Sequence, residues 1–147
     1  MPAPCRVLIV ESDPSDLFLI TRVMSKACPS CALVTLSTAE EVILYLTGEP
    51  PYEDRSKFPA PNLMLMDLKM SGMGGFALLE WLQTRPDLDT VAVLVLTGSE
   101  MPKDHERALE LGADEFHIKP HDYSAMEGLL RAVAAKWLST PSGPAFG

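Results

Sequence analysis

Short aliphatic segments alternate with helix-patterned stretches, and this alternation constrains the fold more than any other feature of the chain. Four apolar segments lie at residues 6–10, 32–36, 63–66 and 91–96, and a weaker fifth at 115–118. They are too short for helices and apolar on both faces, as strands covered on both sides are. The stretches between them place apolar residues at helical spacing. The pattern predicts a doubly wound α/β domain with five parallel strands.

Local signals support these boundaries. Residues 38–41, Thr-Ala-Glu-Glu, form a capping box that predicts a helix start after the second strand. We expect the Pro-rich stretch 47–62 to be an ordered surface loop. Residues 139–147 are rich in Pro, Gly and Ser and predict a disordered tail after a domain that spans residues 1–138.

Charge and hydropathy narrow the classes of partner. Among 147 residues, 20 are Asp or Glu and 12 are Lys or Arg, which gives a formal net charge of -8. No window gathers basic residues as a nucleic-acid surface would need. No apolar run approaches the roughly 18 residues that cross a bilayer. We therefore expect no nucleic-acid partner, no membrane partner and a cytoplasmic location.

The sequence alone assigns no role to the cysteines. The chain has three of them, an odd number, which argues against a disulfide framework and for a reducing compartment. Cys28 and Cys31 form a C-x-x-C pair, the spacing of a redox dithiol or of half a zinc site. The pair follows the first helix at its C-terminal end, where the helix dipole disfavours a thiolate. No second C-x-x-C and no pair of histidines supplies further ligands.

Polar residues follow the predicted strands at the points where they end. They are Glu11, Ser12 and Asp13 after the first strand, Asp67 after the third, Thr97 after the fourth and Lys119 after the fifth. Function in such folds collects at the carboxyl ends of the strands. Glu11 and Asp67 offer oxygen ligands to a hard cation such as Mg²⁺, and Thr97 and Lys119 offer donors to an anion beside it. The set suits phosphoryl transfer onto Asp67, in which positioning and charge neutralisation supply most of the catalysis.

The chain resembles the receiver domains of two-component response regulators from about residue 6 to residue 137. The resemblance rests on four ordered segments, at residues 10–14, 63–75, 95–99 and 116–120. It implies a flavodoxin-like (βα)5 fold and a single-domain response regulator of a phosphorelay, with no output domain. The insertion before the third strand and the long last helix resemble stand-alone receivers associated with phytochrome-type and hybrid sensor kinases.

The resemblance also implies roles and partners. Asp67 would accept a phosphoryl group from a sensor histidine kinase or a phosphotransfer protein, and Lys119 would contact the phosphoryl oxygens. Thr97 and Phe116 would be the switch residues. The face formed by the fourth helix, the fifth strand and the fifth helix would bind a partner or a second copy of the chain. The Lys119–Pro120 peptide bond is expected to be cis.

Magnesium is the implied cofactor. Its ligands would be Glu11, Asp67, the backbone carbonyl of Lys69 and, at a degenerate position, Ser12. Ser12 stands where the family usually supplies a second acid, and a hydroxyl is a poorer Mg²⁺ ligand than a carboxylate. Asp13 is one residue further on, but its expected direction is different, so we do not assign it as a ligand.

Two functions remain open on these residues. Lys69 adds a second cation, which together with Ser12 favours an alternative, a phosphorylation-independent receiver-like binding module. In neither case do we expect an independent enzyme, only self-directed phosphotransfer from a phosphohistidine donor and autodephosphorylation.

Overall fold

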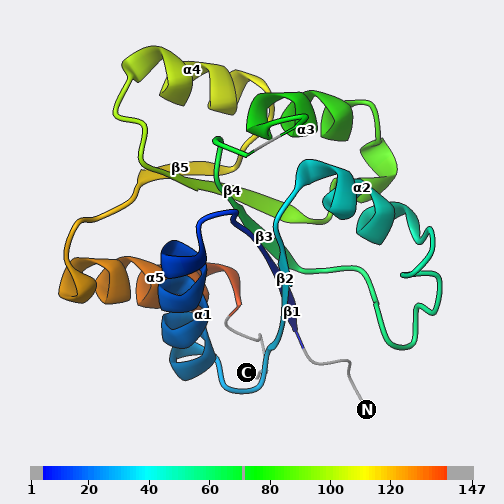
Figure 1. Ribbon diagram of the computed structural model, residues 1–147, viewed down its shortest axis with the longest axis horizontal. Helices are drawn as coiled ribbons and strands as arrows, with labels where there is room; N and C mark the ends of the chain where they lie inside the picture. The colour runs from blue at the N-terminus through cyan, green and yellow to red at the C-terminus, as the bar shows by residue number, and fades with distance from the viewer. Residues whose placement is uncertain (1–4, 71, 139–147) are drawn as a thin grey trace.

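One parallel sheet with helices on both faces forms the centre of the computed structural model, which describes residues 5–70 and 72–138 (Figure 1). The strand order is β2-β1-β3-β4-β5, and every pairing is parallel. The strands are β1 (Arg6–Val10), β2 (Ala32–Leu36), β3 (Leu63–Met66), β4 (Ala92–Thr97) and β5 (Glu115–Ile118). The helices are α1 (Pro14–Ala27), α2 (Ala39–Thr47), α3 (Gly75–Gln83), α4 (Pro102–Glu110) and α5 (Tyr123–Trp137), with a short 3-10 turn, η1 (Pro86–Leu88). The predicted doubly wound α/β fold is confirmed.

Apolar side chains on alternate residues of β1, β3 and β4 build two cores, one on each face of the sheet. In β1, Val7 and Ile9 pack into the core beneath α1 and α5, whereas Leu8 and Val10 pack into the core beneath α2, α3 and α4. Figure 1 shows the same division, with α1 and α5 on one side of the sheet and the other three helices opposite. Burial on both faces explains why the strands are continuous apolar runs in the sequence.

The capping box starts α2 as predicted, with one difference. The Thr38 side chain accepts a hydrogen bond from the Glu41 N–H at 3.1 Å. The Glu41 carboxylate accepts from the N–H of Ser37 at 3.1 Å, so it reaches one residue beyond the usual partner.

The long loop before β3 is ordered by polar and aromatic contacts, as predicted. The Tyr45 hydroxyl donates to the Pro59 carbonyl at 2.9 Å, and the Arg55 guanidinium donates to the Tyr45 carbonyl at 2.8 Å. The rings of Tyr52 and Phe58 lie 5.1 and 6.0 Å from the Tyr45 ring, measured between centroids. These contacts hold the loop against α2.

One expectation about the backbone is wrong, and another concerns residues that the structure does not describe. The prediction of a cis Lys119–Pro120 bond is wrong, since in the described part of the chain the cis bond is Pro50–Pro51. The trans form is the lower-energy isomer of an X–Pro bond, and here the Lys119 N–H donates to the Thr97 carbonyl at 2.7 Å. The predicted tail at 139–147 lies outside the described residues. Across the described ranges, no helix is long and apolar enough to cross a membrane.

The cysteines also differ from the sequence expectation. Cys5 joins Cys28 and Cys31, because β1 and β2 are neighbours in register and Cys5 and Cys31 directly precede them. The structure records the Cys31 sulfur in bonding contact with the sulfurs of both Cys5 and Cys28. No sequence pattern had placed Cys5 beside the C-x-x-C pair.

Gly75 gives a direct test of how the loop after β3 packs. A Cβ at Gly75 would lie 2.6 Å from the Leu68 Cα and 2.9 Å from the Asp67 carbonyl oxygen, both backbone atoms that cannot turn aside. We expect Gly75→Ala to lower the free energy of unfolding by about 1–3 kcal/mol through overpacking, measured by urea denaturation. At Gly128, inside α5, an added Cβ would meet no atom within 4 Å. Gly128→Ala should therefore stabilise by about 0.5–1 kcal/mol, and equal effects of the two variants would contradict this account.

Candidate functional site

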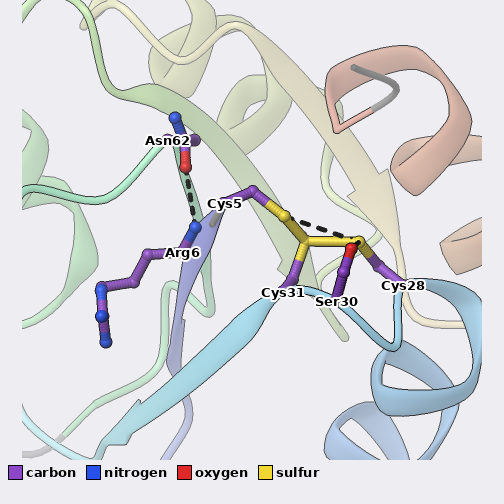
Figure 2. Close-up of a disulfide and its surroundings, with 6 residues drawn as sticks. All are labelled: Cys5, Arg6, Cys28, Ser30, Cys31 and Asn62. Carbon is purple, nitrogen blue, oxygen red and sulfur yellow. Dashed lines mark hydrogen bonds between the residues drawn. A yellow bond between two sulfur atoms is a disulfide. The ribbon is translucent and has the colours of Figure 1, made fainter. Parts of the chain in front are cut away.

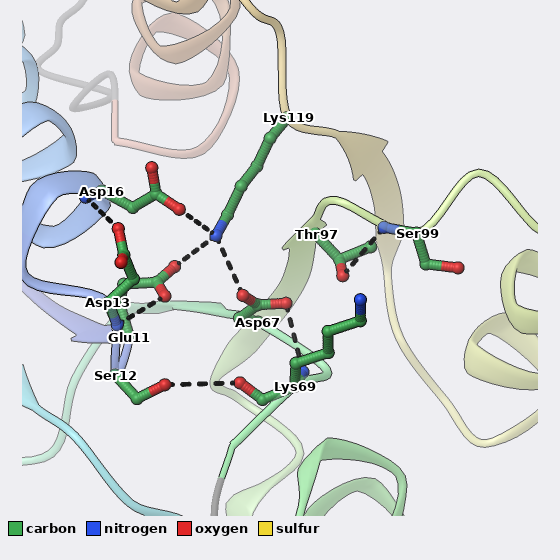
Figure 3. A network of polar contacts seen from close by, with 9 residues as sticks. All are labelled: Glu11, Ser12, Asp13, Asp16, Asp67, Lys69, Thr97, Ser99 and Lys119. Atoms are coloured by element: carbon green, nitrogen blue, oxygen red, sulfur yellow. Dashed lines mark hydrogen bonds and ion pairs between the residues drawn. The ribbon is translucent and has the colours of Figure 1, made fainter.

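The carboxyl ends of four strands bring the predicted polar residues to one edge of the sheet (Figure 3). Glu11 follows β1, Asp67 follows β3, Thr97 is the last residue of β4 and Lys119 follows β5. Glu11, Asp67 and Thr97 are buried, although they are polar or charged. Buried charges require partners, and the arrangement supplies them.

The Lys119 ammonium lies at the centre of this edge. Its Nζ is 2.8 Å from Glu11 Oε1, 2.9 Å from Asp67 Oδ2 and 2.6 Å from Asp16 Oδ2. Three carboxylates against one ammonium leave the cluster with two formal negative charges in excess. The site is therefore built to attract a cation.

Burial and hydrogen bonding set the protonation of the cluster. Burial alone would lower the pKa of Lys119, but hydrogen bonds to Asp16, Glu11 and Asp67 outweigh it and raise that pKa well above its ordinary value. Burial also raises the pKa of Glu11, and the hydrogen bond from Lys119 opposes this rise only in part. Lys119 thus stays charged at neutral pH, and Glu11 takes up a proton at a higher pH than an exposed Glu.

Asp16 is the member of the cluster that sequence reasoning missed. It lies in the first turn of α1, three residues after the N-cap Asp13, whose carboxylate accepts from the Asp16 N–H at 2.8 Å. A signal was present, because the first turn of a helix that follows β1 lies at the same edge of the sheet as Glu11. Asp13 is directed into this cap, so the structure does not bring its carboxylate to Lys119.

The predicted metal positions lie next to one another. The Lys69 N–H donates to Asp67 Oδ1 at 3.2 Å, and the Ser12 hydroxyl lies 3.5 Å from the Lys69 carbonyl oxygen, a long contact. Among the described residues, the Lys69 ammonium takes part in no ion pair. Figure 3 shows the Ser12 hydroxyl and the Lys69 carbonyl on the side of Asp67 away from Lys119.

The two predicted switch residues lie on the neighbouring strands β4 and β5, two register positions apart. Thr97 is fully buried, and its Oγ1 accepts from the Ser99 N–H at 3.4 Å. Phe116 lies in β5, where its ring stacks on His105 of α4 with centroids 4.7 Å apart and an interplanar angle of 7°. Phe116 is therefore packed beneath α4 and is not part of the carboxylate cluster.

Comparisons with known proteins agree with this geometry. The family model of the response regulator receiver domain matches residues 7–131. The two-component response regulator ARR17 of Arabidopsis thaliana is 30% identical over 131 residues, which are 88% of this chain and 84% of that protein. Other curated relatives are longer, since the chain spans 23% of one and 53% of another.

Solved structures agree over nearly the full length. The phosphorylated cyanobacterial phytochrome response regulator RcpA superposes with a TM-score of 0.86 at 25% identity, covering 97% of this chain and 99% of that chain. The Mn²⁺-bound form of response regulator Rcp1 gives a TM-score of 0.84 at 27% identity, covering 97% and 100%. The predicted likeness to phytochrome-associated receivers is confirmed. The chain belongs to the response regulator receiver domain family of two-component signalling.

Proposed function

We propose that the protein is a single-domain response regulator that accepts a phosphoryl group on Asp67 from a sensor histidine kinase or a phosphotransfer protein. The observation that carries this proposal is the ammonium of Lys119, held 2.9 Å from Asp67 Oδ2. A fixed cation at the acceptor can neutralise charge that builds up on the transferring group. The likeness to RcpA, which was solved in a phosphorylated form, supports the same assignment.

The transfer forms one bond and breaks one. An Asp67 oxygen attacks the phosphorus of a phosphohistidine, the P–N bond breaks and its electron pair returns to the donor imidazole, leaving an acyl phosphate. Lys119 remains beside the new phosphoryl oxygens, while the Lys69 N–H holds the other Asp67 oxygen at 3.2 Å. Thr97, buried at the end of the neighbouring strand, is the hydroxyl donor that we assign to the phosphorylated state.

The residues at this edge fit a hard divalent cation. Glu11, Asp67, the Lys69 carbonyl and the Ser12 hydroxyl are all oxygen donors, the ligands that Mg²⁺ prefers, and the cluster has excess negative charge. When bound, Mg²⁺ would neutralise charge on the phosphoryl group. Rcp1 was solved with Mn²⁺, which supports a divalent-cation site at this edge.

We assign partner binding to the face of α4, β5 and α5. Four large apolar side chains on or beside these elements are between 43% and 50% exposed, namely Met101, Leu109, Ile118 and Tyr123. Exposed apolar side chains on these elements favour a protein contact. A kinase, a downstream protein or a second copy of the chain would bind there, and phosphorylation would act on this face through Thr97 and Phe116.

A second candidate is a receiver-like module that binds its partner without phosphorylation. Ser12 favours it, because the site lacks one metal-binding carboxylate, and so does the additional cation Lys69. In this alternative, the ion pairs of Lys119 keep this edge of the sheet in a single conformation.

Beryllofluoride, which mimics a phosphoryl group on an Asp carboxylate, separates the two candidates. With Mg²⁺ present, we expect one bound beryllofluoride per chain, seen as protein-bound ¹⁹F resonances, and none in Asp67→Asn. Bound resonances that persist in Asp67→Asn, or none in the unmodified chain at millimolar Mg²⁺, would favour the phosphorylation-independent module.

A further inference from the structure

Three cysteine sulfurs meet at the end of the sheet opposite Asp67. Cys5 precedes β1, Cys31 precedes β2 and Cys28 follows α1. Figure 2 shows the Cys31 sulfur between those of Cys5 and Cys28, and the sulfurs of Cys5 and Cys28 lie 3.6 Å apart. All three side chains are partly exposed, and their sulfurs lie within 4.8 Å of one another.

The backbone fixes this convergence. The β1–β2 register pairs Arg6 with Ala32, and the Ala32 N–H donates to the Cys5 carbonyl at 2.8 Å, so Cys5 and Cys31 face each other across two strands. The Cys31 N–H donates to the Cys28 carbonyl at 3.1 Å and closes the turn after α1. Secondary structure therefore places the three sulfurs together, whatever their oxidation state.

Three sulfurs at one point match the ligand set of a thiolate-bound metal ion. A sulfur atom forms one disulfide at a time, so the contacts of Cys31 with both neighbours cannot both be disulfide bonds. Zn–S bonds of about 2.3 Å at a tetrahedral angle separate neighbouring sulfurs by about 3.8 Å. The separation of 3.6 Å between the Cys5 and Cys28 sulfurs is close to that spacing.

The position at a helix C-terminus favours a cation over a reactive thiol. Cys28 is the C-cap of α1, where the partial negative charge of the helix opposes a free thiolate. A bound dication reduces that effect, because three thiolates with one Zn²⁺ have a net charge of -1 instead of -3. This end of the helix therefore disfavours a redox dithiol more than it disfavours a metal centre.

We propose that Cys5, Cys28 and Cys31 bind one soft, thiophilic cation such as Zn²⁺ through three thiolates. Binding releases the three thiol protons and involves no oxidation or reduction. A cavity of about 220 Å³ beside Cys28 is lined mainly by Ala and Leu side chains and by Arg131. It offers no fourth protein ligand among the residues that the structure describes, so a water or an external thiol completes the coordination.

Metal titration of the full chain tests the proposal. The protein is reduced, freed of reductant under anaerobic conditions and titrated with Cd²⁺, followed by thiolate-to-metal absorption in the ultraviolet, and with Zn²⁺ against a chromophoric chelator. We expect one ion per chain bound through thiolates. Cys5→Ser, Cys28→Ser and Cys31→Ser should each remove the absorption band and weaken Zn²⁺ binding at least about tenfold. Ser30→Ala, in the same turn but with no ligand changed, should bind as the unmodified chain does.

A second measurement uses the unmodified chain, so its result does not depend on whether the cysteine variants fold. Alkylation of the unmodified chain, counted by intact mass, should give three modified cysteines in the reduced protein and none with one equivalent of Zn²⁺. Three modified cysteines at saturating Zn²⁺, or tight binding that survives Cys5→Ser, would overturn the proposal. So would reduced protein that binds no metal. Asp67→Asn should leave Zn²⁺ binding at the cysteines unchanged, so this proposal and the phosphoacceptor assignment fail independently.

Discussion

Lys119→Met is expected to lower the free energy of unfolding at neutral pH by about 3 kcal/mol, in the range seen when one partner of a buried ion pair is removed. The Lys119 side chain is 13% exposed, and those of Glu11 and Asp67 are 3% and 7% exposed. Without the ammonium, their carboxylates face each other unpaired in a poorly hydrated site. Urea denaturation at several pH values measures the effect.

The direction in which the stability of Lys119→Met changes with pH is a sharper test of the role of Lys119. Burial already raises the pKa of Glu11, and Lys119→Met removes the hydrogen bond that opposes this rise. The folded variant then binds more protons than the unfolded chain, so its stability rises as the pH falls from about 7 towards 5. In the unmodified chain, the pKa of Lys119 is raised from 10.5. Its stabilisation is therefore fully present below that value and is lost only as the pH rises through the higher, folded pKa.

Lys136→Met is the matched control. Lys136 pairs with Glu115, but its side chain is 63% exposed, and exposed ion pairs contribute about 0–1 kcal/mol. Equal losses in the two variants, or a Lys119→Met variant that is further destabilised by acid, would contradict the central place of Lys119.

Ser12→Asp is expected to raise the affinity for Mg²⁺ at least about tenfold, because it adds a carboxylate where the site now has a hydroxyl. The Ser12 side chain lies beside the Lys69 carbonyl, on the side of Asp67 away from Lys119. Isothermal titration with Mg²⁺ measures the change. The same substitution should lower the melting temperature without metal, because it adds repulsion to a cluster that already has excess negative charge, and Mg²⁺ should restore it.

Ser12→Asn separates charge from size, since it supplies an amide oxygen without a charge. It should change the affinity for Mg²⁺ much less than Ser12→Asp does. If neither variant alters the affinity, Mg²⁺ does not bind at this edge of the cluster and the assignment of Ser12 as the degenerate ligand position is wrong.

The fold was predictable because its strands are buried on both faces and stand out as short apolar runs. β1, β2, β3 and β5 have the predicted bounds, and β4 differs by one residue at each end. Glu11, Asp67, Thr97 and Lys119 were brought together as predicted because parallel strands place their carboxyl ends at one edge. That argument needs only the order of elements and the residue that follows each strand.

The remaining features depend on geometry that the sequence does not encode locally. The sequence places Asp16 in the first turn of α1, at the correct edge of the sheet, but its ion pair with Lys119 depends on how far that long side chain reaches. Cys5 joins the C-x-x-C pair only through the β1–β2 register. The stacking of Phe116 on His105 likewise requires the packing of α4 over β5.

The phosphoacceptor assignment is tested most directly by intact mass after incubation with Mg²⁺ and a small phosphodonor such as acetyl phosphate, beside an Asp67→Asn control. We expect one phosphoryl adduct per chain, dependent on Mg²⁺ and absent from Asp67→Asn. An adduct of equal yield in Asp67→Asn, or none in the unmodified chain at millimolar Mg²⁺, would contradict phosphoryl transfer to Asp67.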